Sequence, residues 1–272
     1  MPKSTYMYWQ KRFDREDPDE DLRRKILAIR EEHPNFGYRR ICATLQNQGI
    51  CINRKKVHRL TKKYGLQVSS FTRKSRRYSS YKGNVGRIAP NRVNRRFCTS
   101  IPHQKITTDT TEFKYYEVDE KGRMTIRKAY LDPFMDLWNL EILSYGISKA
   151  PSAASIMGAL EETILKTDDC RYRRTFHSDR GWAYQMKSYQ YALKENRIFQ
   201  SMSRKGNCYD NARMENFFGI MKQEMYYGRI YSSFEELKAA IENYIRYYNE
   251  HRIKACLGWR SPVQYRIEQL AA

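Results

Sequence analysis

The sequence contains no Asp or Glu from His33 to Thr108, and this acid-free stretch is the feature that most constrains what the chain can be. Residues 1–104 carry 25 Lys and Arg against eight Asp and Glu, so they hold most of the formal net charge of +21. A solvated protein surface normally mixes both signs of charge. We therefore expect residues 33–108 to form a surface that faces the phosphates of a nucleic acid.

An anionic membrane is the alternative partner for such a basic chain. The sequence has no lipidation signal, no isolated basic amphipathic helix and no run of about 20 apolar residues. Residues 1–12 are polar and lack the apolar run of a secretory signal. The six cysteines are scattered and form no C-x-x-C pair, which argues against a zinc knuckle or a disulfide framework. We expect a cytoplasmic protein with reduced thiols and no membrane partner.

Residues 21–66 have the pattern of three short helices, with a polar arm of residues 1–20 before them. His33 and Pro34 close the first helix, and Asn53 is a good N-cap for the third, whose outward positions are strongly basic. This pattern predicts a helix-turn-helix DNA-binding domain. The alternative is a small helical bundle with an ordinary basic surface. The candidates for DNA contact are basic residues of the second and third helices: Arg39, Arg40, Arg54, Lys55, Arg59 and Lys62.

The amino-acid composition of the sequence changes twice after the third helix. Residues 67–104 combine low hydrophobicity with high charge, which indicates a basic linker that orders, if at all, on nucleic acid. From Lys105, runs of β-branched and aromatic residues come first, then helices alternate with strands, and two long helical segments follow. With 40% apolar residues the chain can bury a sizeable core, and this order predicts a mixed α/β domain.

Three acidic residues of this domain stand out by their positions. Asp109 interrupts a strand-like run, where a charge is unfavourable unless it points at an open site or a partner. Asp179 follows a short strand, and Glu215 lies near the start of a helix whose Met and Phe stripe faces the core. Two carboxylates ~4 Å apart repel by about 4 kcal/mol at an effective dielectric of 20. Such a cluster favours Mg²⁺, which prefers hard oxygen ligands and in pairs promotes phosphodiester chemistry. The alternative is three ordinary surface acids.

Five ordered motifs resemble those of a known family. They are NFGYRRI at 35–41, HSDRG at 177–181, DNARMENFF at 210–218, YN at 248–249 and LGWRSP at 257–262. Together they resemble the second reading frame product of the insertion sequence three family of transposases, within the DDE transposase and retroviral integrase superfamily. The resemblance covers nearly the whole chain. The sequence departs from the family at residues 105–106, where relatives often carry an aromatic, and it lacks the zinc-binding amino-terminal module of retroviral integrases.

The resemblance implies a fold and an activity. The fold is α/β: a ribonuclease H-like integrase catalytic core over residues 105–268, with a mixed five-stranded sheet and flanking helices, preceded by the small all-α helix-turn-helix domain. The implied activity is that of a DNA transposase, which cleaves the ends of an insertion sequence and joins them by attack of a 3′-hydroxyl on a phosphodiester. Asp109, Asp179 and Glu215 occupy the positions of the catalytic residues, which hold two Mg²⁺ ions, with Mn²⁺ as a substitute.

The resemblance also implies partners and further site residues. The partners are double-stranded DNA, as terminal inverted repeats and as target, further copies of the chain on that DNA, and an upstream-frame product or fusion, in the nucleoid of a bacterium. Asn211 and Lys222 match positions that place DNA, although a solvated Lys222 is an equal alternative. Asp136 matches a supporting acidic position. Asp210 lies either near the site or at the N-cap of its helix.

Two other functions remain open at this point. The first is a DNA-binding regulator or domesticated relative that holds the ends of an element without catalysis. The second is a structure-specific nuclease on the same fold, which the basic helical module before the catalytic domain disfavours.

Overall fold

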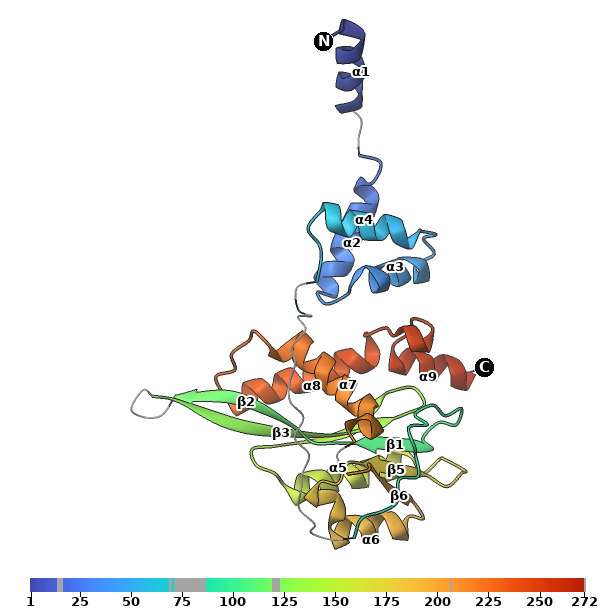
Figure 1. Ribbon diagram of the computed structural model, residues 1–272, viewed down its shortest axis with the longest axis vertical. Coiled ribbons are helices and arrows are strands. Elements are labelled where there is room, and N and C mark those ends of the chain that lie inside the picture. The colour runs from blue at the N-terminus through green and yellow to red at the C-terminus, as the bar shows by residue number, and fades with distance from the viewer. Residues whose placement is uncertain (14–16, 69, 71–86, 119–122, 206, 272) are drawn as a thin grey trace. The chain divides into compact units, whose positions relative to one another are not determined.

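The computed structural model describes residues 1–13, 17–68, 70, 87–118, 123–205 and 207–271 (Figure 1). The chain forms two compact units, Met1–Thr72 and Arg73–Ala272. In the described part of the chain, no helix has the length and apolar character needed to cross a membrane.

The first unit is helical and contains the predicted helix-turn-helix domain. Its helices are α1 (Lys3–Phe13), α2 (Glu20–Glu32), α3 (Tyr38–Asn47) and α4 (Arg54–Lys63). The Asn53 side chain accepts a hydrogen bond from the backbone N–H of Lys55 at 2.8 Å and so caps α4 as expected. Apolar residues of α2, α3 and α4 are fully buried and form the small core: Ile26, Ile41, Leu45, Val57 and Leu60.

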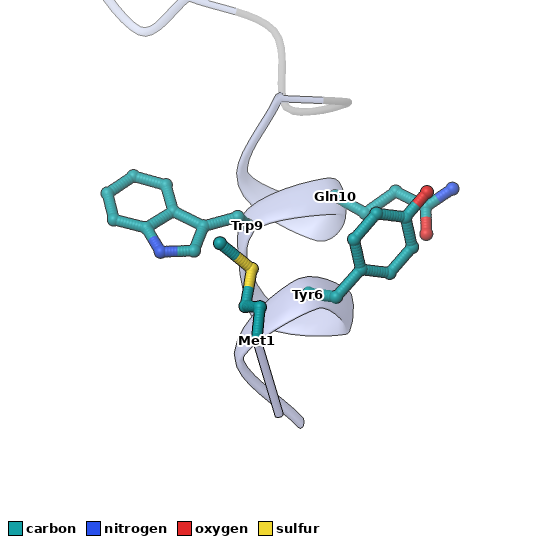
Figure 2. Close-up of a pocket in the computed structure, with 4 residues that line it drawn as sticks. All are labelled: Met1, Tyr6, Trp9 and Gln10. Atoms are coloured by element: carbon teal, nitrogen blue, oxygen red, sulfur yellow. The ribbon is translucent and has the colours of Figure 1, made fainter. Parts of the chain in front are cut away.

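Helix α1 lies within the stretch that the sequence indicated as an arm. Its surface carries large apolar side chains, including Tyr6, Tyr8 and Trp9. Figure 2 shows Met1, Tyr6, Trp9 and Gln10 around a pocket on this helix.

Within the described residues of the second unit, six strands form one sheet. They are β1 (Lys105–Thr108), β2 (Thr111–Val118), β3 (Met124–Asp136), β4 (Ile142–Ser148), β5 (Thr175–Ser178) and β6 (Phe199–Met202). Strand β3 pairs antiparallel with β1, β2 and β4, whereas β5 runs parallel to both β1 and β6. The sheet is therefore mixed, as predicted.

The sixth strand arises because one long strand is divided at Asp109 and Thr110. Strands β1 and β2 pair with β3 in one common register, since Ile106 lies opposite Asp136 and Thr111 opposite Leu131. Continuing this register places Asp109 opposite Pro133, which has no N–H to donate to a ladder. The expected five strand positions are thus present, and the interruption falls at the predicted catalytic aspartate.

Helices cover both faces of the sheet (Figure 1). They are α5 (Ala153–Lys166), α6 (Lys187–Glu195), α7 (Ala212–Met221), α8 (Phe234–Glu250) and α9 (Pro262–Ala271). One apolar core joins β2 and β3 to α7 and α8, and includes the predicted Met and Phe stripe of α7. The other core joins β1 and β5 to α5 and α6. This three-layer arrangement is the ribonuclease H-like fold that the sequence predicted.

Residues 87–104, the C-terminal part of the expected basic linker, pack against this α/β unit. Val93 is 2% exposed. The backbone N–H groups of Arg92 and Val93 donate to Ser201 Oγ at 2.9 and 3.3 Å. The segment is ordered because it buries an apolar side chain and pairs its backbone with β6, which its basic composition did not indicate. Most of the remaining linker, residues 71–86, lies outside the described residues.

Candidate active site

Asp109 directly follows β1 and is partly buried. Its Oδ1 accepts a hydrogen bond from the backbone N–H of Thr110 at 2.8 Å. Burial raises the pKa of Asp109 well above its usual value, and the negative charges of Asp179, Glu215 and Asp132 raise it further. Asp109 is therefore a carboxylate surrounded by other carboxylates.

Asp179 lies beside Asp109 because of the strand register. Strands β1 and β5 are parallel, with Thr107 opposite His177, so both aspartates lie two residues beyond this pair at the same edge of the sheet. Asp179 Oδ1 accepts from the backbone N–H of Gly181 at 2.7 Å. Burial raises the pKa of the Asp179 carboxyl above its usual value. Two sequence motifs that are far apart in the chain thus supply one pair of acids.

Glu215 approaches from the first turn of α7. The start of this helix is fixed to β1 by Asn211, whose Oδ1 accepts from Thr107 Oγ1 at 2.6 Å and whose Nδ2 donates to the Thr108 carbonyl at 3.1 Å. Burial raises the pKa of Glu215, and its charge raises that of Asp109. Asn211 therefore brings the third predicted acid to the end of β1.

The donor chemistry of this site fits a hard divalent cation. Carboxylate oxygens are the ligands that Mg²⁺ prefers, and a cation would relieve the repulsion that raises the pKa of Asp109. Among the residues that the structure describes, no three His, Cys, Asp or Glu side chains are gathered into a set that could hold a metal ion. The fold thus makes Asp109 and Asp179 neighbours, while Glu215 acts on Asp109 through its charge.

Asp132 is an acid of this site that the sequence analysis missed. It is 1% exposed in β3, and its Oδ1 accepts from Thr110 Oγ1 at 2.7 Å. Burial raises the pKa of Asp132 to about 6, although hydrogen bonds from Thr110 and Ser155 oppose the shift. The argument that singled out Asp109, a charge inside an apolar strand, applies equally to this position.

Asp136, which the resemblance gave as a supporting acid, lies at the far end of β3. It is fully buried and accepts hydrogen bonds from the backbone N–H groups of His103 and Trp138, each at 2.9 Å. Burial raises the pKa of Asp136 to about 6. Its contacts hold the turn after β3 and do not reach the acids at Asp109.

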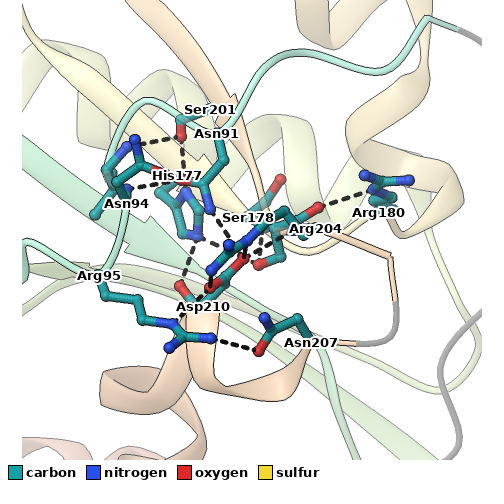
Figure 3. Close-up of polar contacts among 12 residues, drawn as sticks. Asn91, Asn94, Arg95, His177, Ser178, Arg180, Ser201, Arg204, Asn207 and Asp210 are labelled. Atoms are coloured by element: carbon teal, nitrogen blue, oxygen red, sulfur yellow. Dashed lines mark hydrogen bonds and ion pairs between the residues drawn. The ribbon is translucent and has the colours of Figure 1, made fainter.

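Asp210 is the centre of a polar network next to α7 (Figure 3). Its buried carboxylate accepts from the backbone N–H and the guanidinium of Arg204, from Arg95 Nε at 3.0 Å and from Asn91 Nδ2 at 2.9 Å. The Arg204 guanidinium, followed by the backbone and Arg95 bonds, holds the pKa of Asp210 well below its usual range. The N-capping alternative is wrong, since the N-cap residue of α7 is Asn211 and Asp210 precedes it. Asp210 instead joins the 87–104 segment to the start of α7.

His177 belongs to the same network, and its ring nitrogens contact other residues of the protein. Its Nδ1 lies 2.9 Å from Ser201 Oγ, and its Nε2 lies 2.8 Å from the Asp210 carbonyl oxygen (Figure 3). Burial lowers the pKa of His177 to about 4, so the ring is neutral at pH 7.

Two residues predicted to contact DNA are engaged within the protein. Asn211 is 3% exposed and uses its amide on β1, so in this structure it positions the start of α7. Lys222 donates from Nζ to the Glu112 carbonyl at 2.9 Å and lies over the Phe113 ring. Lys222 also begins a π-helical segment, η3 (Lys222–Tyr226).

The basic residues predicted on the helix-turn-helix domain differ in their surroundings. Arg39, Arg54, Lys55 and Lys62 are exposed. Arg59 is exposed as well, but its Nη2 forms an ion pair with Asp19 at 2.8 Å. The Arg40 guanidinium lies over the Phe36 ring, 5.5 Å from its centre.

Comparison with known proteins agrees with these features. Integrase core domain models match residues 99–208 and 215–270, and a model described as an HTH-like domain matches residues 16–75. The InsK protein for insertion sequence element IS150 of Escherichia coli strain K12 is 40% identical over 267 residues, which cover 98% of this chain and 90% of that protein. The transposase InsF for insertion sequence IS3A of the same organism is 31% identical over 249 residues, 90% of this chain and 82% of that protein.

A transposase-like protein of Haemophilus influenzae is 43% identical over 221 residues, 81% of this chain and 96% of that protein. Among solved structures, the HTLV-2 integrase catalytic core domain in complex with magnesium has a TM-score of 0.45 and 16% identity, covering 61% of this chain and 97% of that one.

The fold and the matched domains define a DNA transposase with an integrase-type catalytic core and an HTH-like domain. More narrowly, the chain belongs to the IS3 family of transposases, within the DDE transposase superfamily. Enzymes of this superfamily generally use divalent metal ions.

Proposed function

We propose that this chain cleaves the ends of an insertion sequence and joins them to another DNA site, with Asp109, Asp179 and Glu215 as its catalytic, metal-binding residues. The observation that carries the proposal is the placement of acids from separate motifs. The parallel register of β1 and β5 brings Asp109 and Asp179 to one edge of the sheet, and Asn211 fixes the start of the helix of Glu215 to β1. Burial, together with the charges of Asp179, Glu215 and Asp132, raises the pKa of Asp109, and carboxylates perturbed in this way are typical of functional sites.

The reaction needs an anionic nucleophile to approach an anionic phosphodiester. Two Mg²⁺ ions, with Mn²⁺ as a substitute, would supply charge neutralisation and Lewis acidity when bound by the three carboxylates. The strand edge holds Asp109 and Asp179 side by side, and Asn211 holds the helix of Glu215 against β1. In strand transfer, the 3′-oxygen of the element end forms a new bond to the target phosphorus. The former phosphorus–oxygen bond breaks, and its oxygen leaves as a new 3′-hydroxyl.

The proposed partners are the terminal inverted repeats and the target DNA, bound by several copies of the chain in the bacterial nucleoid. An upstream-frame product or fusion is a further proposed partner. The exposed basic residues of α3 and α4 support a DNA-facing surface on the helix-turn-helix domain. We expect Arg54→Ala, Lys55→Ala and Lys62→Ala to weaken binding of element ends more than Arg59→Ala, because Asp19 already compensates Arg59. Fluorescence anisotropy with labelled duplexes at several salt concentrations measures this order, and equal losses would contradict it.

The test of catalysis is strand transfer on short duplexes that carry the element ends, with Mg²⁺, with Mn²⁺ and with EDTA. The Asp109→Ala, Asp179→Ala and Glu215→Ala variants should lose strand transfer and keep DNA binding. Glu161→Ala is the matched control, because Glu161 is an exposed carboxylate of α5. A triad variant that still transfers strands would refute the assignment of that residue.

A non-catalytic DNA-binding regulator is the second candidate, and the basic helix-turn-helix domain alone would be enough for it. Both candidates predict salt-sensitive binding, with six to ten phosphate contacts costing ~10³–10⁵-fold in affinity between 50 and 200 mM salt. They differ in the strand-transfer assay. If the chain and its upstream-frame fusion both bind element ends but transfer no strands with either metal, the regulator is favoured.

A further inference from the structure

The buried hydroxyl of Tyr184 lies behind the two aspartates at the strand edge. Tyr184 is 1% exposed and belongs to the 3₁₀ turn η1 (Trp182–Gln185), which follows Asp179 closely in the chain. Its hydroxyl oxygen lies 3.4 Å from Oγ1 of Thr108 and 3.4 Å from Oγ1 of Thr110. These two threonines flank Asp109 in the chain. Both hydrogen bonds of the Tyr184 hydroxyl therefore involve residues next to Asp109.

Asp132 fixes the direction of the hydrogen bond between Tyr184 and Thr110, and the Tyr184 oxygen then accepts from Thr108. The Thr110 hydroxyl donates its proton to Asp132 Oδ1 at 2.7 Å, which leaves its lone pairs to accept from Tyr184. Ser155 Oγ lies 3.4 Å from the other oxygen of Asp132 and donates to it. The series of hydrogen bonds from the buried Tyr184 through the exposed Thr110 to the buried Asp132 therefore connects the interruption between β1 and β2 to β3.

The turn that carries Tyr184 is tied equally closely to Asp179. Gly181 donates its backbone N–H to Asp179 Oδ1, and its carbonyl accepts from the backbone N–H of Tyr184 at 3.2 Å. A methyl group added at Gly181 would lie 2.9 Å from Asp179 Oδ1 and 3.3 Å from Cδ2 of the Tyr184 ring. The Asp179 carboxylate and the Tyr184 ring therefore both border Gly181 and leave no room for a side chain there.

We propose that Tyr184 is a positioning residue that sets the spacing of Asp109 and Asp179, acting together with Thr110 and Asp132. The inference rests on the proposed function, since it concerns two carboxylates assigned there to metal binding. The backbone N–H of Tyr184 donates to Gly181 in the Asp179 turn, the ring borders the space beside Gly181, and the hydroxyl lies near Oγ1 of both neighbours of Asp109. One side chain thus links the two segments that carry the acids.

The test uses the full chain and compares two buried tyrosines. Tyr184→Phe removes the hydroxyl and keeps the ring. Tyr189→Phe is the matched control, because Tyr189 is also 1% exposed and stacks edge-on against Tyr184 with ring centres 5.5 Å apart. The readout is the Mg²⁺ concentration that gives half of the metal-induced rise in melting temperature. The Mg²⁺ dependence of strand transfer is measured in parallel.

We expect Tyr184→Phe to raise the half-saturating Mg²⁺ concentration about tenfold, the scale seen when a group that orients metal ligands is lost. Tyr189→Phe should match the unaltered protein. Asp132→Asn keeps an oxygen that accepts from Thr110, so it should shift the Mg²⁺ midpoint less than Asp132→Ala.

An unchanged Mg²⁺ midpoint in Tyr184→Phe, or an equal shift in both tyrosine variants, would overturn the inference and leave the proposed function intact. The proposed function fails separately if Asp109→Asn keeps both the metal-induced rise in melting temperature and strand transfer. These two failures are therefore distinguishable in one set of measurements.

Discussion

Asp109 and Asp210 lie in the same unit, and their surroundings have opposite electrostatic character. The charges that act on Asp109 are other carboxylates, and together with burial they raise its pKa. Asp210 is more deeply buried, yet Arg204 and Arg95 compensate its charge and lower its pKa. A carboxylate whose charge is compensated by the protein's own Arg side chains holds segments of the chain together. A carboxylate left among like charges is suited to bind a cation from solution.

The largest effect that separates the two regions should come from Asp109→Asn. This change removes one of several repelling charges and one proposed metal ligand. Strand transfer should fall at least ~10³-fold, as expected when several kcal/mol of transition-state stabilisation are lost. The melting temperature of the metal-free protein should rise by about 2–4 °C, the shift that ~1 kcal/mol produces in a domain of about 200 residues. Differential scanning calorimetry in EDTA measures the rise. A drop in melting temperature would show that the Asp109 carboxylate stabilises the folded protein.

Asp210→Asn should have the opposite effect on stability. It leaves Arg95 and Arg204 without their carboxylate, and these side chains are 48% and 53% exposed, so solvent softens the loss. We expect the free energy of unfolding at pH 7 to fall by about 1–3 kcal/mol, below the full cost of breaking a buried pair. Urea unfolding of both proteins measures the difference.

The pH dependence of that difference tests its cause. Because the pKa of Asp210 is lowered in the folded protein, its stabilisation is present above the usual carboxyl pKa of about 3.9 and declines as the pH falls below it. The stability gap between Asp210→Asn and the unaltered protein should therefore narrow below about pH 4. A gap that stays constant or widens in acid would mean that charge pairing is not what Asp210 contributes.

The smallest effect should come from Arg95→Ala. Arg95 makes one bond to Asp210 and one to Asn207, whereas the Arg204 guanidinium makes two bonds to Asp210. We expect Arg95→Ala to cost about 0.5–1 kcal/mol and Arg204→Ala more, because half-exposed pairs contribute little singly. Urea unfolding of both variants shows which one loses more free energy of unfolding. A larger loss in Arg95→Ala would mean that the 87–104 segment supplies most of the stabilisation at Asp210.

Local signals in the sequence predicted much of the fold and part of the candidate site. Helix caps and apolar periodicity predicted α2, α3 and α4, and β-branched runs followed by helices predicted the mixed sheet. The position of Asp109 inside a strand-like run and that of Asp179 after a short strand predicted that both residues are functional. The strand register then brought them to one edge.

Contacts between segments that are distant in the chain could not be predicted from such local signals. The sequence shows Asp132 as a charge inside an apolar strand, but only the structure shows that it accepts a hydrogen bond from Thr110 next to Asp109. The sequence shows Asn211 only as a polar residue near the predicted site. The structure shows that its amide is hydrogen-bonded to β1. The Glu224 carboxylate lies in a buried ion pair with Arg252, 28 residues later, and nothing local to either residue indicates the other.

The sequence by itself determined which elements form and where charge accumulates, because capping, periodicity and net charge are properties of neighbouring residues. Only the tertiary structure decided which carboxylates are compensated and which are left among like charges. That distinction depends on distances and burial between segments far apart in the chain, and electrostatic energies change steeply with both.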